Sequence, residues 1–266
     1  MRTILLLLLL ATMSAPIRAQ GLPSGDGHDP LRDIGFDQKL GEVVPSDLQL
    51  IDEDGRSESL GDLLGGKPAI LDLGYYHCPM LCGQVENGLL DSLKGVDWTV
   101  GRQYRVLTVS IDPRERPDLA RHHKARTLSR YDRQIDPNGW RFLVGTPAEL
   151  VRLTQAVGYR AIYDRRIDQF AHPAGLVLLT GQGKISSYLY GISFPSRALS
   201  RGLEKAAQER VGTPVDPILY LCYHYDPATG RYSLEIMRVV QLCACGTLLL
   251  LFGCVGTWLW RERRRA

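Results

Sequence analysis

Short apolar runs and longer amphipathic runs alternate through the middle of the chain. Three runs rich in branched apolar residues, at 68–73, 104–111 and 140–144, have the length and composition of buried strands. Two helical patterns, at 83–93 and 117–128, separate them. Strands that alternate with helices in this way predict a parallel central sheet.

Further elements are predicted on both sides of this core. They are hairpin strands at 48–51 and 57–59, a helix from Thr146 to about Gly158, hairpin strands at 176–180 and 185–190, and a helix at 197–208. A closing antiparallel hairpin makes the central sheet mixed. We therefore predict an α/β domain with a thioredoxin-like fold, followed by a C-terminal transmembrane helix.

Both ends of the chain carry membrane-related signals. Residues 1–19 combine a basic start with an apolar run from Ile4 to Leu10, which predicts a secretory signal peptide; an uncleaved anchor is the alternative. Residues 239–260 hold no charge and are long enough to span a bilayer. The basic tail 261–266 predicts a cytoplasmic C-terminus, because positive residues stay inside. We expect a single-pass protein of the cell (inner) membrane, with its main domain in the periplasm or extracytoplasmic space.

Between these ends, the chain is expected to contain an extended leader at 20–44, the thioredoxin-like domain at 45–210 and a juxtamembrane segment at 211–238. The formal net charge of +3 comes from the two ends. Removing the arginines of the signal peptide lowers it to +1, and removing the charged residues of the tail leaves about −2. This balance does not indicate a nucleic-acid partner.

The strongest chemical signal is a pair of cysteines, Cys78 and Cys82, between a predicted strand and a predicted helix. The amino end of a helix favours thiolates, and thiolates select Cu(I) and, together with imidazole, also hold Cu(II). A structural disulfide and a purely redox-active dithiol are the alternatives. A structural disulfide would not normally lie on a strand-to-helix turn with Pro79 between its cysteines, so the pattern favours metal binding.

His172 is the candidate third ligand. It precedes the predicted strand 176–180, and in a thioredoxin-like fold the loop before that strand faces the cysteine turn. Its small and apolar neighbours favour the neutral, metal-binding form of the ring. Tyr75 and Tyr76 are expected to shield the metal from water, and His77 to tune the thiolate beside it.

At these residues the chain resembles the Sco/SenC family of copper-binding assembly factors for cytochrome c oxidase. The resemblance spans residues 43–208 and includes the cysteine turn after an apolar strand, the strand end Val109-Ser110-Ile111-Asp112-Pro113-Arg114, and the histidine before a late strand. It implies that Cys78, Cys82 and His172 bind Cu(I) or Cu(II). It also implies delivery of copper to the binuclear site of oxidase subunit II, or reduction of the cysteines of that subunit.

The chain departs from this family pattern in three places. Relatives often have an acidic residue in the cysteine turn and an Asp before the histidine, where this chain has Met80-Leu81 and Ala171. Its membrane helix is C-terminal, whereas many relatives carry an N-terminal one.

Two further groups of residues have competing interpretations. Alternating residues at 219–227 and the turn before Gly230 predict a small hairpin near the membrane. Its Cys222 and His224 could form a second metal site or belong to a packed strand with an unpaired thiol. His122 and His123 are expected on a solvated helical face.

The favoured hypothesis is a copper metallochaperone rather than an enzyme. The alternative is a thiol–disulfide reductase that acts on an exported partner, in which Cys78 attacks and Cys82 resolves.

Overall fold

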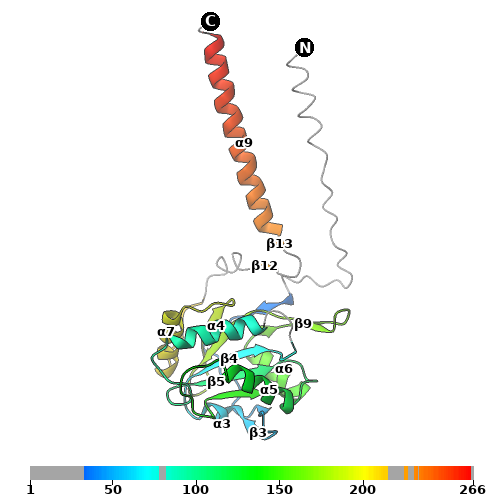
Figure 1. Cartoon of the computed structure of the whole chain (residues 1–266), viewed down its shortest axis with the longest axis vertical. Helices are drawn as coiled ribbons and strands as arrows, with labels where there is room; N and C mark the ends of the chain where they lie inside the picture. Colours follow the sequence, from blue (N-terminus) through cyan, green and yellow to red (C-terminus); the bar gives the residue numbers. More distant parts are fainter. Residues whose placement is uncertain (1–32, 78–81, 215–224, 227–230, 233, 265–266) are drawn as a thin grey trace.

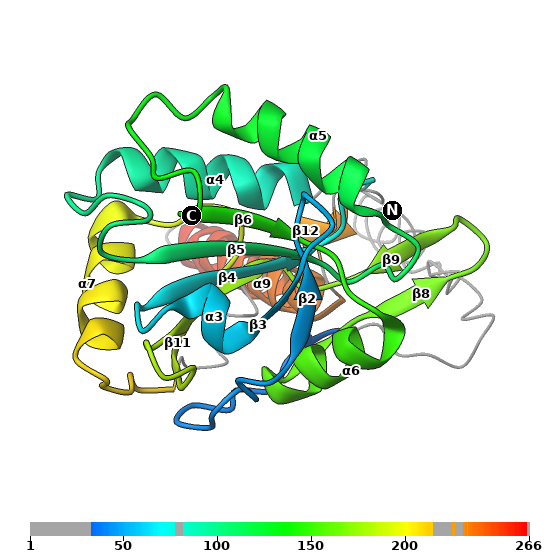
Figure 2. The ribbon, with the colours of Figure 1, turned by 90° about the horizontal axis from the view of Figure 1, so that it is seen from below.

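The computed structural model describes residues 33–77, 82–214, 225–226, 231–232 and 234–264. A five-stranded sheet with the strand order β11-β10-β4-β5-β6 lies at the centre of the domain (Figure 2). Its strands are β4 (Ala69–Gly74), β5 (Arg105–Ser110), β6 (Trp140–Leu143), β10 (Gly175–Leu179) and β11 (Ile185–Tyr190).

The sheet is mixed, as predicted. β4 is parallel to β5 and β5 to β6, so that Asp72 lies opposite Thr108. β10 is antiparallel to β4, with Leu176 opposite Asp72, and β11 is antiparallel to β10. The start of β10 therefore meets the carboxyl ends of β4 and β5 at one edge of the sheet.

Helices cover both faces of the sheet (Figure 2). One face packs against α4 (Cys82–Lys94), α5 (Pro117–Leu128) and α7 (Ser196–Ala207). The other packs against α3 (Leu60–Leu64) and α6 (Pro147–Ala156). Alternate residues of each strand contribute to the two cores, and each fully buried leucine contributes roughly 1.5–3 kcal/mol to stability.

Local sequence explains where these helices begin. Pro117 opens α5, because its fixed φ suits the first turn and its missing N–H leaves no donor unpaired there. Thr146 caps α6, and its hydroxyl accepts a hydrogen bond from the amide of Glu149 at 3.4 Å. Both helices have the start that the sequence predicts.

Within the described residues, four small two-stranded sheets accompany the central one. The predicted hairpin of β2 (Gln49–Ile51) and β3 (Ser57–Ser59) is present. The pairing of β1 (Gly35–Phe36) with β7 (Tyr159–Arg160) and that of β8 (Ile162–Asp164) with β9 (Gln169–Ala171) were not predicted. The pairing of β12 (Tyr225–Asp226) with β13 (Arg231–Tyr232) agrees with the small hairpin predicted near the membrane. The ring of Phe36 packs against Tyr159, Tyr188 and Tyr190, so the packed structure begins before Pro45.

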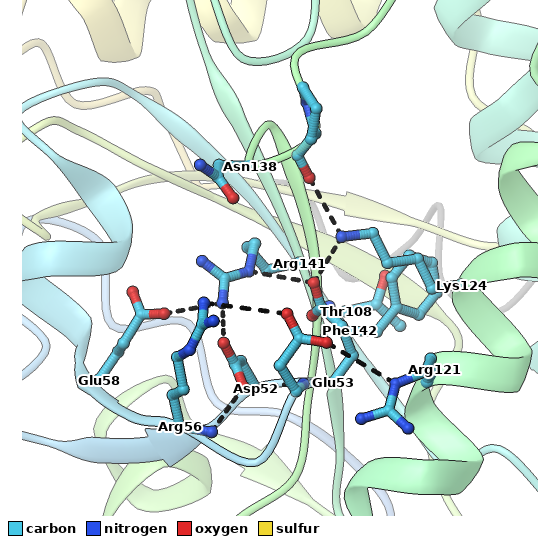
Figure 3. A network of polar contacts seen from close by, with 12 residues as sticks. Asp52, Glu53, Arg56, Glu58, Thr108, Arg121, Lys124, Asn138, Arg141 and Phe142 are labelled. Carbon is cyan, nitrogen blue, oxygen red and sulfur yellow. Dashed lines mark hydrogen bonds and ion pairs between the residues drawn. The ribbon is translucent and has the colours of Figure 1, made fainter.

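A buried ionic network fastens the β2–β3 hairpin to the sheet and to α5 (Figure 3). Arg141 of β6 forms ion pairs with Asp52 and Glu53 at the hairpin turn and with Glu58 of β3. Lys124 of α5 reaches Glu53 from the other side. Because Asp52 is fully buried, its charge depends on these partners.

The helix α9 (Leu234–Arg263) follows the domain (Figure 1). Its stretch Cys243–Arg263 has a mean hydropathy of 1.7, and none of that stretch is buried. By length and composition it can cross a membrane. The predicted signal peptide at 1–19 lies outside the described residues.

Candidate metal centre

Three segments meet at the edge of the sheet where β4 ends. They are the residues after β4, the residues after β5 and the residues before β10. Because β10 is antiparallel to β4, the residues before β10 lie beside those after β4, and the ring centroids of His172 and Tyr75 are 5.7 Å apart. His172 therefore lies beside the segment that leads to the cysteine turn.

The cysteine turn itself is described only at its two ends. Cys82 is the first residue of α4, one residue before the start that the helical pattern predicts, while Cys78 lies outside the described residues. Within the part of the chain that the structure describes, no three His, Cys, Asp or Glu side chains form a metal cluster. The ligand set of Cys78, Cys82 and His172 therefore stays a prediction, and the pair Cys222 and His224 also lies outside the described residues.

A buried carboxylate holds the segment that enters the turn. Both oxygens of Glu115 accept backbone hydrogen bonds at 2.8 Å, one from the amide of Tyr76 and one from the amide of His77. The ring Nδ1 of His77 lies 3.2 Å from the same carboxylate. Because the side chain of Glu115 is only 3% exposed, this contact fixes the backbone directly before Cys78. Sequence reasoning missed Glu115, since nothing local marks a contact across 39 residues.

The two tyrosines before the turn have different surroundings. Tyr75 is buried against Phe170 and His172. Tyr76 points into the opposite core, where its hydroxyl donates to the carbonyl oxygens of Leu143 at 2.9 Å and Thr108 at 3.1 Å. Tyr75 therefore has the position expected of a shield beside His172, whereas Tyr76 anchors the strand end.

The half-buried imidazole of His172 is oriented by hydrogen bonds at Nδ1. This atom lies 3.1 Å from the carbonyl oxygen of Pro173 and 2.9 Å from the hydroxyl of Tyr159. The Tyr159 hydroxyl donates to the carbonyl oxygen of Leu73 at 3.0 Å, so it can accept from the ring. Since a carbonyl can only accept, we assign the proton to Nδ1, which puts the lone pair of the neutral ring on Nε2. Metal-binding histidines commonly have this arrangement.

A buried carboxyl pair lies behind the turn, on the face covered by α4 and α5. Burial and the negative charge of Glu86 raise the pKa of Asp72 to about 7, although a hydrogen bond with Thr108 acts in the opposite direction. Glu86 lies one turn after Cys82 in α4 and accepts a hydrogen bond at 2.7 Å from Thr127. Asp72 was not predicted as part of the site, although a carboxyl group inside an otherwise apolar strand is a signal that could have identified it.

His123 corrects an expectation from the sequence. His122 is exposed, as predicted, but the side chain of His123 is 14% exposed and its Nε2 lies 2.6 Å from Glu86. Its ring also packs against Tyr76 at 5.0 Å. The helical pattern could not reveal this contact, because Glu86 comes from another helix.

Two hollows lie beside these residues. A cavity of about 20 Å³, enough for one water molecule, is lined by Asp72, Glu86, His123 and His172, among others. A cleft of about 670 Å³ runs past His77 and opens between the start of α5 and the β8–β9 hairpin. The segment that leads into the turn thus has a surface cleft on one side and polar groups on the other.

Comparison of the sequence with known protein families gives a match. The family described as SCO1/SenC matches residues 37–208, more than half of the chain. No curated protein matches the sequence significantly.

Solved structures share the fold. A crystal structure from Aquifex aeolicus VF5 is 28% identical, with a TM-score of 0.57, and the match covers 64% of this chain and 95% of that one. Arabidopsis thaliana ScoI with copper bound is 19% identical, with a TM-score of 0.51 and coverages of 63% and 99%. BsSco, a member of the Sco family of cytochrome c oxidase assembly proteins, is 20% identical, with a TM-score of 0.50 and coverages of 65% and 98%.

Proposed function

This chain belongs to the SCO1/SenC family, and on that premise we propose that its domain binds copper and serves the assembly of cytochrome c oxidase. Two relatives support the proposal. Arabidopsis ScoI has been solved with copper bound, and BsSco belongs to a family of cytochrome c oxidase assembly proteins.

In this proposal the copper ligands are the thiolates of Cys78 and Cys82 and the Nε2 atom of His172. The observation that carries it is the orientation of His172, whose Nδ1 is held by Pro173 and Tyr159 beside Tyr75, at the edge where α4 begins. Two soft thiolates and one imidazole suit three-coordinate Cu(I), and the same set can hold Cu(II). The helix N-terminus at Cys82 favours its thiolate form.

Copper is the cargo of such a protein. We propose that the domain lies outside the inner membrane, anchored by α9 with its basic tail in the cytoplasm, and delivers copper to the binuclear site of oxidase subunit II. The cleft beside His77 would give the cysteines of that subunit access to the metal, so that ligand exchange can carry it across.

Copper titration tests the proposal. The wild-type chain should bind one Cu(I), and the paired change Cys78→Ser, Cys82→Ser should abolish binding. His172→Ala should bind more weakly, because it loses one ligand. The paired change Cys222→Ser, His224→Ala is the matched control and should leave one copper per chain. Wild-type protein that binds no copper, or binding that survives the loss of both cysteines, would overturn the proposal.

The position of Cys82 also favours a second candidate function. A thiol at the first turn of a helix is suited to thiol–disulfide exchange, so the domain could reduce the cysteines of its partner instead. His172→Ala separates the two functions: it should weaken copper binding but leave turnover on a disulfide substrate nearly unchanged.

A further inference from the structure

Arg114 lies in the loop after β5 and connects the central sheet to the β8–β9 hairpin. Its guanidinium forms a two-pronged contact with the buried carboxylate of Asp112, with Nε at 2.8 Å and Nη2 at 2.6 Å from the two oxygens. The remaining nitrogen, Nη1, donates to Asp168 at 2.5 Å and to the hydroxyl of Tyr163 at 3.0 Å. The two-pronged contact fixes the plane of the guanidinium, so Nη1 presents a fixed donor to the hairpin.

The hairpin turn ends in a strained residue at this contact. Asp168 has a φ of 54°, in the left-handed region that non-glycine residues rarely occupy. Aspartate tolerates this conformation better than most residues, and here its carboxylate accepts hydrogen bonds from both Arg114 and Tyr163. Strain of this kind persists only where surrounding contacts hold the residue in place.

A row of aromatic rings connects Arg114 to His172, the candidate copper ligand. The guanidinium carbon of Arg114 lies 4.9 Å from the ring centroid of Tyr163, which lies 5.1 Å from that of Phe170. Phe170 is 5.8 Å from Tyr75, and Tyr75 is 5.7 Å from His172. The backbone provides a second connection, because the three residues of β9 are all that separate Asp168 from His172.

We propose that Arg114, Asp168 and Tyr163 are positioning residues that hold the β8–β9 hairpin and, through it, the imidazole of His172 in the orientation for binding copper. This inference rests on the proposed function. None of the three residues touches the metal in this account. They act because the hairpin leads directly into the histidine, and because its rings pack against Tyr75 beside that histidine.

The ion pair between Arg114 and Asp168 contributes little to folding, because the two side chains are 52% and 71% exposed. Arg114→Ala also removes the partner of the buried Asp112 and therefore lowers stability, whereas Asp168→Asn leaves that pair intact and tests the hairpin contact alone. Loss of a group that orients a metal-binding histidine typically lowers metal affinity about 10- to 100-fold. We expect about a tenfold loss for Arg114→Ala.

The experiment measures Cu(I) affinity of the full chain in detergent, in competition with a chelator of known affinity. Arg114→Ala should bind about tenfold more weakly than wild type. Asp168→Asn, which keeps a side chain tolerant of the left-handed backbone, should show a loss in the same direction. The matched control is Arg116→Ala, because Arg116 is 82% exposed and only approaches Asp118 at 3.8 Å; it should bind like wild type.

A double-mutant cycle shows whether Arg114 affects copper binding through His172. In a chain that already carries His172→Ala, Arg114→Ala should have no further effect on affinity. Hydrogen exchange in the metal-free chain should be faster at the amides of residues 162–171 in Arg114→Ala and unchanged in Arg116→Ala. An Arg114→Ala chain with wild-type affinity, or an equal loss with and without His172, would overturn the inference. Wild-type protein that binds no copper would overturn the proposed function itself, a separate and distinguishable result.

Discussion

Replacing Asp72 with asparagine should remove much of the pH dependence of folding in this domain. Asp72 is almost fully buried, and burial together with the charge of Glu86 raises its pKa from an ordinary 3.8 to about 7. The folded chain therefore holds the proton of Asp72 more tightly than the unfolded chain does. Stability from this group is fully present below about pH 4 and is lost as the pH rises through about 7.

The size of the effect follows from the two pKa values. Each pKa unit corresponds to about 1.4 kcal/mol, so moving from 3.8 to about 7 corresponds to roughly 4 kcal/mol. Asparagine has nearly the same shape and can still accept the hydrogen bond from Thr108, but it cannot ionise. The difference in unfolding free energy between Asp72→Asn and wild type should therefore increase by roughly 2–4 kcal/mol, in favour of Asp72→Asn, as the pH rises from 4.5 to 8.

Urea unfolding of the metal-free domain, residues 33–214, at several pH values would measure this gain. The fluorescence of buried Trp140, whose indole donates to Thr108 at 3.0 Å, provides the signal. The matched control is Asp118→Asn, because the side chain of Asp118 is 71% exposed and stays in water when the chain folds. If wild type and Asp72→Asn lost stability in parallel between pH 4.5 and pH 8, the reasoning about this buried carboxyl would be refuted.

Three other substitutions test the supports of the site and the fold. Glu115→Ala should lower the free energy of unfolding by about 1–3 kcal/mol, measured by urea unfolding, because the amides of Tyr76 and His77 lose their acceptor. An unchanged free energy of unfolding would contradict the role of Glu115 in holding this segment. Arg141→Met should cost about 3–5 kcal/mol in the same assay, because Asp52 stays buried without its partner, and a neutral result would show that water relieves that charge. Tyr159→Phe should weaken Cu(I) binding about tenfold in chelator competition, because Nδ1 of His172 loses a hydrogen-bond partner; unchanged affinity would mean that the contact with Pro173 suffices.

Sequence patterns predicted the strands of the central sheet and the helices α4, α5, α6 and α7, but not the short helix α3. The start of α5 followed from Pro117 and that of α6 from the capping residue Thr146, because these signals act within a single turn of helix. The hairpin of β8 and β9 was missed, since its strands have three residues each and the charged turn at 165–168 holds no glycine. The equally short hairpin of β2 and β3 could be predicted because Asp54-Gly55 marks its turn.

In the candidate site, too, local features could be predicted from the sequence and distant contacts could not. Its three predicted ligands could be proposed from residue type and position, and the structure places His172 beside the strand that leads to the turn. The groups that orient the site could not be predicted, because Glu115, Tyr159 and Arg114 act on segments 13 to 54 residues away. Only the three-dimensional fold brings such residues together.

X-ray absorption at the copper edge of the Cu(I)-loaded full chain tests the central claim most directly. The account predicts two sulfur ligands and one nitrogen ligand in wild type. In His172→Ala it predicts that the nitrogen is lost and both sulfurs remain. A copper environment without sulfur, or one that is the same in wild type and His172→Ala, would contradict the account.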